Sequence, residues 1–277
     1  MEQKSFVRTV AYLFLLLLLV SIYSCHSGIP VEPNINNELT KYDPLHLLDA
    51  IPDENLKYAV LQQILAIKSQ GSKEGYTYES ITPADFDKVT SLSLSNKGIQ
   101  NLLGIQLFKN LTYLDLSSNT FGGFSSLSGL KKLTYLSISS CHLINLSPLS
   151  SISSLETLIA DKNNISDISG LSALQNLKTL NLMLNSIVDI SPLKNLTNLE
   201  NAQLRFNLIE DISPLQNCLK IKLIDINKNK VKSLPSFEGC NQLKQIMAGS
   251  NQISSISGIQ NLESLEIIWL VENNITN

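Results

Sequence analysis

The 277-residue sequence has few aromatic residues (6%), few charged residues (16%), three histidines and four cysteines. Lysine and arginine number 21 and aspartate and glutamate number 24, so the formal net charge is only -3. This charge is too small to indicate a nucleic-acid partner or a strongly acidic one. Hydrophobic residues nevertheless make up 43% of the chain, which argues against extended disorder. The composition predicts a folded, leucine-dominated protein with a repetitive core.

A hydrophobic run long enough to span a bilayer is also missing near the start of the chain. Lys4 and Arg8 precede the apolar run AYLFLLLLLV at 11–20. This run is shorter than the ~18 residues that a transmembrane helix needs. A basic start followed by a short apolar core predicts a secretory signal peptide over residues 1–24.

The expected signal peptide ends in Ile22-Tyr23-Ser24-Cys25, which resembles the lipobox of bacterial lipoproteins. The resemblance implies cleavage before Cys25, lipid attachment there and stable anchoring by several acyl chains. It places the exported protein in the bacterial outer membrane or on the cell surface. The alternative is a plain signal peptide that is cut nearby, with Cys25 incidental. Residues 25–38 contain Pro30 and Pro33 and predict a flexible tether.

Residues 39–88 differ in pattern from the rest of the chain and predict a helical cap. Asp53 can cap a helix with Gly71 as its stop, because apolar residues recur there at spacings of three and four: Leu56, Val60, Ile64 and Ile67. Thr82-Pro83-Ala84-Asp85 predicts a second short helix. It has a hydroxyl cap, a proline at the first helical position and an acid three residues after the cap.

From Val89 onward the sequence repeats every 22 residues without an insertion. Eight full units and a partial ninth fill residues 89–277, and they start at Val89, Leu111, Leu133, Leu155, Leu177, Leu199, Ile221, Leu243 and Leu265. Apolar residues occupy positions 1, 4, 6, 11, 14, 17 and 20. The alternation at positions 4 and 6 predicts a short strand, and the later spacing of three predicts a tight helical turn. Because one unit cannot bury seven apolar side chains alone, stacked units must share one core.

This spacing resembles the leucine-rich repeat, L-x-x-L-x-L-x-x-N/C-x-L. Asp-Ile at positions 13 and 14 is similar to bacterial internalin-like surface proteins, as at Asp167-Ile168, Asp189-Ile190 and Asp211-Ile212. The helical segment before the repeats resembles the cap of such proteins. The resemblance implies a curved α/β solenoid with a parallel β-sheet on the concave face, 3-10 turns on the convex face and an α-helical N-terminal cap. It also implies a protein ligand, which it does not name.

Several recurring polar residues have a structural interpretation. Asparagine at position 9 can bond to backbone groups of its own and adjacent turns, which predicts a structural ladder of Asn119, Asn163, Asn185, Asn207, Asn229, Asn251 and Asn273. Cys141 takes the same position in the third unit and needs no redox role. Serine and proline at positions 15 and 16 are expected to cap and start the convex turn, at Ser147-Pro148, Ser191-Pro192 and Ser213-Pro214.

Cys218 and Cys240 both occupy position 20, one unit apart. Rungs that are ~4.8 Å apart would permit a disulfide between them. Parallel side chains in register point the same way, however, so buried free thiols are the preferred interpretation.

No arrangement of residues typical of an enzyme was found, and we expect no catalysis, cofactor or metal. His26, His46 and His142 have neither a cysteine nor a second histidine at metal-ligand spacing. The sequence has no phosphate-binding glycine loop and no serine nucleophile elbow. Three carboxylates share the predicted strand face, but they lie in units at least two apart, too far for a concerted acid-base pair: Asp115, Asp161 and Asp225.

Function is expected at positions 3, 5, 7 and 8, whose side chains point away from the core on the strand face. The first three units are mostly small or polar there, around the pair Tyr113 and Tyr135. Later units place larger groups at these positions: Ile159, Met183, Leu184, Arg205, Phe206, Leu223, Met247, Ile267, Trp269 and Val271. Such side chains are common interface anchors, so we predict a protein ligand across units 4 to 9, with Arg205 and Phe206 central. Alternatively, several of them lie flat over the sheet or face a second copy.

The ninth unit stops at Asn277 without a polar terminal cap, so Trp269 and Leu270 are expected on an open edge. Either the chain is a truncated product or a homodimer covers this edge. Two functions remain open. One is a lipid-anchored cell-envelope protein that binds another protein, in adhesion or host interaction. The other is a structural or assembly factor within the envelope that associates with itself through the C-terminal edge.

Overall fold

The computed structural model describes residues 48–69 and 80–276. The expected signal peptide, Cys25, the tether and Gly71 lie outside the described residues. Leu48–Asn277 forms one compact unit. No helix in the described ranges has the length and apolar character needed to cross a membrane.

Helix α2 spans Glu54–Ser69 and contacts the first repeat, where the Asn55 amide donates to the Gly98 carbonyl at 2.9 Å. Asp53 caps it, because its Oδ1 accepts a hydrogen bond from the Leu56 N–H at 2.9 Å. The other oxygen of Asp53 accepts the N–H groups of Gln100 and Asn101, at 2.7 and 2.9 Å. One carboxylate therefore starts the helix and joins it to unit 1. The buried face differs slightly from the predicted one, because Ile67 is half-buried and the buried residues are Leu56, Val60, Leu61 and Ile64.

The second helix, α3, is a single turn over Pro83–Phe86. The N–H and the hydroxyl of Thr82 both donate to Asp85 Oδ2 at 2.9 Å. Asp85 is buried and forms ion pairs with Lys68 at 2.8 Å and Lys88 at 3.0 Å. Burial would raise the pKa of Asp85, but the bonds from Lys68, Thr82 and Lys88 outweigh it and hold that pKa well below its usual range. The Lys68 pair ties α2 to α3.

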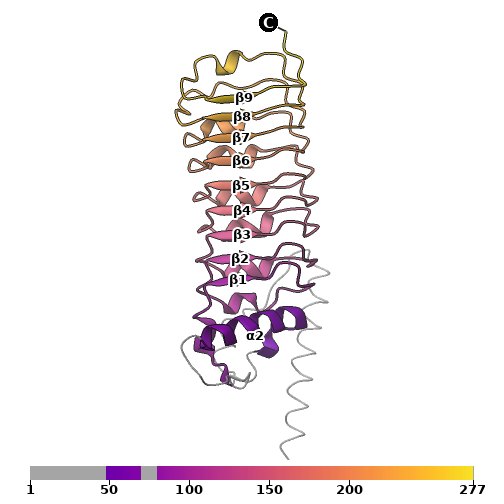
Figure 1. Cartoon of the computed structure of the whole chain (residues 1–277), viewed down its shortest axis with the longest axis vertical. Coiled ribbons are helices and arrows are strands. Elements are labelled where there is room, and N and C mark those ends of the chain that lie inside the picture. The colour runs from indigo at the N-terminus through magenta and orange to yellow at the C-terminus, as the bar shows by residue number, and fades with distance from the viewer. Residues whose placement is uncertain (1–47, 70–79, 277) are drawn as a thin grey trace, which may run out of the picture. The chain divides into compact units, whose positions relative to one another are not determined.

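Nine parallel strands follow in sequence order and form one sheet, as the repeat predicted (Figure 1). Neighbours pair 22 residues apart, as Leu180 pairs with Ala202. Positions 4 and 6 point into the core, where Leu180 and Leu182 are fully buried. The strands are β1 Ser91–Ser93, β2 Tyr113–Asp115, β3 Tyr135–Ser137, β4 Thr157–Ile159, β5 Thr179–Asn181, β6 Asn201–Gln203, β7 Leu223–Asp225, β8 Gln245–Met247 and β9 Ile267–Trp269.

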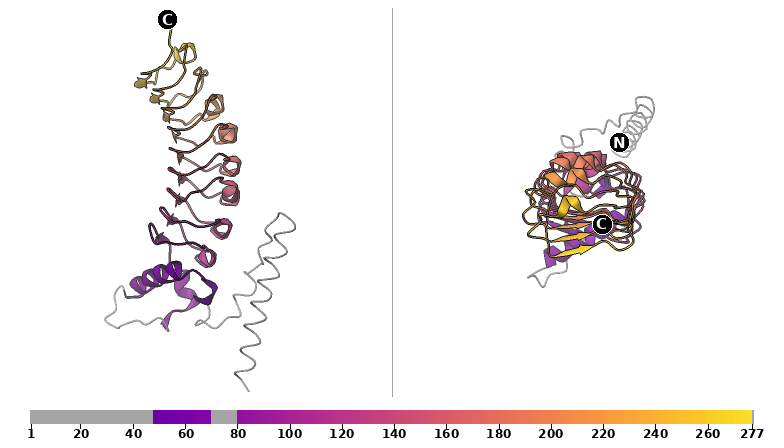
Figure 2. Two further views of the ribbon diagram at one scale, coloured as in Figure 1. Left: turned by 90° about the vertical axis from the view of Figure 1, so that its right-hand side faces the viewer. Right: turned by 90° about the horizontal axis from the view of Figure 1, so that it is seen from above.

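Short 3-10 turns stand on the side opposite the sheet, and Figure 2 shows the strands on the inner side of a gentle curve. These turns are η5 Ile105–Leu107, η6 Ser125–Gly129, η7 Ser147–Ser151, η8 Ser169–Ala173, η9 Ser191–Asn195, η10 Ser213–Asn217 and η11 Ser257–Ile259. Unit 7, residues 221–242, is described throughout and has no such turn. It carries Ser233 at position 13, and its proline, Pro235, comes one position earlier than in units 3, 5 and 6. The serine alone does not explain the missing turn, because Ser255 at the same position of unit 8 accepts the Ser257 N–H of η11 at 3.2 Å.

The serines at position 15 do not cap these turns, so that prediction was wrong. Ser191 and Ser213 are the first residues of their turns, and their own N–H groups need an acceptor. The residue two positions earlier supplies it. Asp189 Oδ1 accepts the Ser191 N–H at 2.7 Å, and Asp211 Oδ1 accepts the Ser213 N–H at 2.8 Å. The recurring acid at position 13 is therefore the cap, and the proline stands in the first turn as predicted.

The position 9 amides lie inside the solenoid and connect adjacent units. Asn163 Oδ1 accepts the N–H groups of Cys141 and Leu143, at 2.8 and 3.1 Å. Its amide donates to the carbonyls of Ile138 and Ala160, at 2.9 and 3.1 Å. The other position 9 asparagines make the same kind of contacts, with both amide ends bonded to backbone: Asn119, Asn185, Asn207, Asn229, Asn251 and Asn273.

The cysteines inside the repeats are free and buried. Cys141 occupies the asparagine position and donates its thiol to the Leu116 carbonyl at 3.3 Å. Cys218 and Cys240 are thiols rather than a disulfide, as preferred above. Burial raises the pKa of Cys218 to about 12, so this group is protonated at neutral pH.

Candidate functional site

The candidate surface is the outer side of the sheet, formed by positions 3, 5, 7 and 8, and is called the concave face below. Each later-unit side chain predicted to face outward lies partly or fully in solvent. Ile159, Met183, Arg205, Phe206, Leu223 and Met247 are half-buried, whereas the most exposed are Leu184, Ile267, Trp269 and Val271. Trp269 has 52% of its side chain exposed. The face therefore presents apolar and aromatic groups to solvent in units 4 to 9.

The first three units differ, because their polar groups bond to one another. Tyr113 and Tyr135 stack with ring centroids 4.5 Å apart and an angle of 11° between the planes. The hydroxyls of Ser117 and Ser137 are 2.6 Å apart, and Asp115 Oδ1 accepts the Ser117 N–H at 2.9 Å. Burial, together with Tyr113 and Asp115, raises the pKa of Tyr135. Each tyrosine has one ring face already covered, which leaves less surface for a ligand.

The centre of the later units is a cation–aromatic cluster of Arg205, Phe206 and Lys228. The guanidinium carbon of Arg205 lies 5.4 Å from the centroid of the Phe206 ring, and the ammonium nitrogen of Lys228 lies 4.8 Å from it. Both cations are within cation–π range of one ring. The structure thus brings together the two residues predicted to be central and adds Lys228, which the sequence analysis missed.

Phe206 occupies a position where the backbone is left-handed. Position 8 has a positive φ in every unit, and φ is 56° at Leu184 and 57° at Phe206. This left-handed conformation is unfavourable for bulky residues, and most other units carry a small or polar residue there, such as Asn96 or Ser118. The backbone gives no reason for leucine or phenylalanine at this position. The constant φ could not be read from the sequence.

Trp269 leans over the neighbouring unit. A Cβ added to Gly249 would lie 2.8 Å from Trp269 Cδ1 and 2.9 Å from its Nε1, so the indole lies against this glycine. The position of Trp269 agrees in part with the alternative stated above, in which some outward side chains lie flat over the sheet. Since about half of the side chain stays exposed, Trp269 still offers surface to a ligand.

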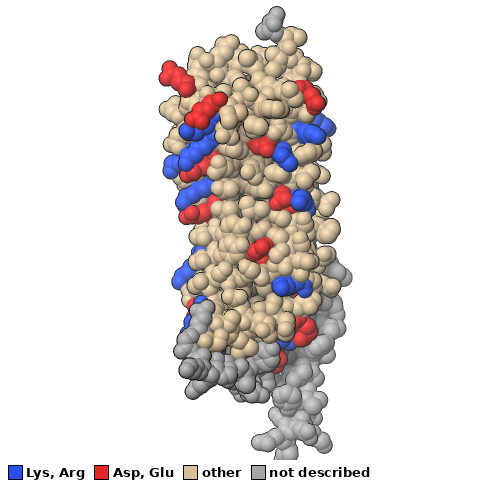
Figure 3. Space-filling view, in the orientation of Figure 1, with Lys and Arg blue, Asp and Glu red and all other residues tan. Residues whose placement is uncertain are grey.

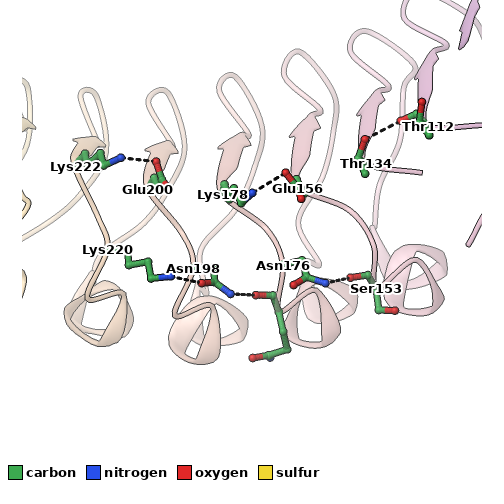
Figure 4. Close-up of polar contacts among 11 residues, drawn as sticks. Thr112, Thr134, Ser153, Glu156, Asn176, Lys178, Asn198, Glu200, Lys220 and Lys222 are labelled. Atoms are coloured by element: carbon green, nitrogen blue, oxygen red, sulfur yellow. Dashed lines mark hydrogen bonds and ion pairs between the residues drawn. The ribbon is translucent and has the colours of Figure 1, made fainter. Parts of the chain in front are cut away.

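The charges beside the strands are largely paired with one another. Figure 3 shows the strand side, where charged groups gather in a column at the left and much of the remaining surface is uncharged. Position 2 forms ion pairs between neighbouring units, shown in part in Figure 4: Glu156 with Lys178 at 2.8 Å, Glu200 with Lys222 at 2.7 Å and Lys244 with Glu266 at 2.7 Å. Nearer the convex turns, Lys220 donates to Asn198 at 2.8 Å. These contacts link units and leave those groups less available to a partner.

The carboxylates on the concave face are each engaged by a neighbour. Asp161 accepts the Ser139 hydroxyl at 2.6 Å, and Asp225 accepts the Asn227 amide at 2.8 Å. Burial raises the pKa of Asp225, although the Asn227 bonds and the charge of Arg205 oppose this. Within the described ranges, no three potential metal ligands gather in one place.

A hollow of about 820 Å³ lies on the convex side of units 7 and 8, next to the missing turn. Its lining includes Glu238, Asn241, Asn261 and Glu263. None of the predicted ligand-binding residues lines it, and the sequence analysis did not indicate it.

Comparison with known proteins agrees with this geometry. The family described as "Leucine rich repeat" matches residues 87–143, and the two-copy family "Leucine Rich repeats" matches residues 153–195. Internalin C2 from Listeria monocytogenes, whose crystal structure has been solved, is 31% identical in sequence to this chain, and the two structures match with a TM-score of 0.73. The match covers 82% of this chain and 96% of that chain. This chain belongs to the internalin-type leucine-rich repeat family.

More distant leucine-rich repeat structures share the fold alone. The functional domain of InlJ from Listeria monocytogenes is 23% identical with a TM-score of 0.61, and the match covers 83% of this chain and 53% of that one. A leucine-rich repeat protein of Leptospira interrogans is 22% identical with a TM-score of 0.51, over 70% of this chain and 64% of the other. No curated protein sequence matches the chain. Internalin-type repeats are generally protein-binding scaffolds rather than enzymes.

Proposed function

We propose that this protein binds another protein on units 4 to 9 of its concave face. The observation that carries the proposal is the exposed group of large side chains there, beside the cation–aromatic cluster. Tryptophan, arginine and phenylalanine supply much of the binding energy at protein interfaces. Exposed apolar surface is unfavourable in a monomer unless something covers it part of the time.

Affinity capture tests this proposal with the purified full-length chain as bait, against envelope extract and candidate host surface proteins. The test variant carries Arg205→Ala, Phe206→Ala and Trp269→Ala. The matched control carries Lys194→Ala in η9 and Tyr58→Ala in α2, which also removes one cation and one exposed aromatic ring but leaves the concave face unchanged. We expect a partner that the wild type and the control retain and the test variant loses. Equal capture by all three folded proteins would contradict the proposal.

We further propose that the chain is a lipid-anchored envelope protein, with the lipid on Cys25. The lipobox-like sequence supports this step. Cells fed a clickable fatty acid should label the wild type but not Cys25→Ser. An unlabelled wild type would contradict the anchor and leave a plain signal peptide as the interpretation.

Adhesion or host interaction is the role that we propose for an outward-facing domain. Protease added to intact cells should remove the domain if it faces outward. Protection from protease would instead favour an assembly role within the envelope. Self-association through the C-terminal edge is a second form of that assembly role. Sedimentation over a range of concentrations tests this alternative, and a monomer throughout would contradict it.

A further inference from the structure

The cation–aromatic cluster contains positive groups without a counter-charge. Neither Arg205 nor Lys228 forms an ion pair within the described residues. The Nε atom of Arg205 is buried from solvent and has no hydrogen-bond partner. A buried donor without an acceptor is unfavourable by about 1–3 kcal/mol, so such a group calls for an explanation.

Asp225 is the nearest candidate counter-ion, but its carboxylate is already engaged. Its Oδ1 accepts the N–H of Asn227 at 3.1 Å and the side-chain amide of Asn227 at 2.8 Å. Arg205 lowers the pKa of Asp225 only through its charge, and among the described residues the two do not form an ion pair. The guanidinium is therefore held by Phe206 and remains available to an acceptor from outside.

The surroundings of Arg205 are apolar on one side. The N–H of Leu184 donates to the Arg205 carbonyl at 3.0 Å, which sets units 5 and 6 side by side at this point. Met183 and Leu184 therefore lie on the rung next to Arg205 and Phe206, and both are partly or fully exposed. An acceptor that reaches the guanidinium would arrive beside a patch suited to an apolar side chain.

The charge balance of this face favours a single anionic group over a polyanion. In units 4 to 9, positions 3, 5, 7 and 8 carry three cations, Lys162, Arg205 and Lys228, and three acids, Asp161, Asp225 and Glu272. A phosphate backbone needs a continuous positive surface, which these acids interrupt. A carboxylate fits better, because it matches the planar guanidinium and can bond to it with both oxygens.

We propose that the protein ligand places a glutamate or aspartate side chain against Arg205, with a large apolar side chain next to it over Phe206, Leu184 and Met183. Lys228, whose ammonium nitrogen lies 4.8 Å from the centroid of the Phe206 ring, strengthens the attraction. This proposal rests on the proposed function and adds the chemistry of the partner.

The test uses a random dodecapeptide display library selected on the purified full-length chain. We expect selected peptides to be enriched in an acid that lies within three residues of a large apolar residue. A selected peptide is then synthesised with that acid and with the matching amide, and the dissociation constants of both are measured by fluorescence anisotropy. The acid form should bind the wild type about tenfold more tightly, and added salt should reduce the difference.

Arg205→Gln assigns the effect to one residue. We expect Arg205→Gln to bind the acid and amide forms about equally tightly. The control Lys194→Gln, which removes one cation from the convex side, should keep the wild-type preference for the acid form. Thermal melts of both variants verify that they are folded.

The outcomes separate this inference from the proposed function. Absence of acid enrichment, or a preference that persists in Arg205→Gln, overturns the carboxylate proposal. If Phe206→Ala still weakens binding of the selected peptides, the proposed binding to the concave face stands even though the carboxylate proposal has failed. Peptides that bind Phe206→Ala and Arg205→Gln as tightly as the wild type contradict both.

Discussion

The first three units and the later units are built on the same interior but present different surfaces. Leu114 in β2 and Ile224 in β7 are both fully buried, and Asn119 and Asn229 make equivalent amide contacts. On the concave face, the early units bond their serines and tyrosines to one another. The later units leave Arg205 unpaired and Trp269 half exposed. The comparison shows that the repeat determines the interior, whereas recognition depends on positions that it leaves free.

The largest expected difference between these regions is in ligand binding. Arg205→Ala with Phe206→Ala should weaken binding of the captured partner roughly 100-fold, because both are partly exposed groups of the kind that dominate interfaces. Tyr113→Ala with Tyr135→Ala should weaken it less than about fivefold, because these rings already stack on each other. Surface plasmon resonance with the captured partner measures both. A larger loss in the tyrosine variant would reverse the comparison.

The interior, in contrast, should respond alike in both regions. Asn119→Ala and Asn229→Ala should each destabilise the fold by about 1–3 kcal/mol, since each leaves buried backbone groups without partners. Asn185→Ala should do the same. Urea unfolding followed by circular dichroism measures these changes. An unchanged midpoint in any of the three would show that its amide is dispensable.

A smaller effect concerns Asp225 and depends on pH. Burial raises the folded-state pKa of this carboxyl above its unfolded value, so the ionised form opposes folding at neutral pH. As the pH falls through the folded pKa toward about 3.9, protonation removes this cost. The stability of the wild type minus that of Asp225→Asn should therefore rise on acidification, by less than about 1 kcal/mol because the group is half-exposed. Urea midpoints at pH 7 and pH 4 measure it, and a fall would contradict the sign.

The smallest expected change concerns the only tryptophan in the chain. Gly249→Ala would bring a methyl group to 2.8 Å from the Trp269 ring and must displace it. Because the ring is half exposed, we expect a stability change of about 0.5 kcal/mol or less. The fluorescence maximum of Trp269 should nevertheless shift. Ser250→Ala on the next residue is the control, and identical spectra for Gly249→Ala and the wild type would place the indole elsewhere.

The sequence predicted those parts of the fold that follow from periodicity. The 22-residue register was enough for the strands, their order and the buried positions, because stacking allows only one arrangement of such units. The outward direction of Arg205, Phe206 and Trp269 followed from alternation along each strand.

Features set by local geometry could not be predicted in the same way. The aspartate cap at position 13 depends on which N–H groups the 3-10 turn leaves free, and serine was wrongly assigned that role. The contact of Lys228 with Phe206 depends on side-chain directions across two rungs. The missing turn in unit 7 does not follow from position 13 alone, because units 2 and 8 form their turns with Gly123 and Ser255 there.

The constant register also makes the spacing on the concave face discrete. Removing one complete unit between Tyr135 and Arg205 would bring the tyrosine pair and the cation–aromatic cluster closer by one strand separation, ~4.8 Å. The interior would meet the same kinds of neighbours as before, since every unit offers the same buried positions. A deletion that is not a whole number of units would break the amide ladder. In such an architecture, the distance between two recognition groups changes only in multiples of the strand separation. The contact groups of the ligand must therefore be spaced to match one of these multiples.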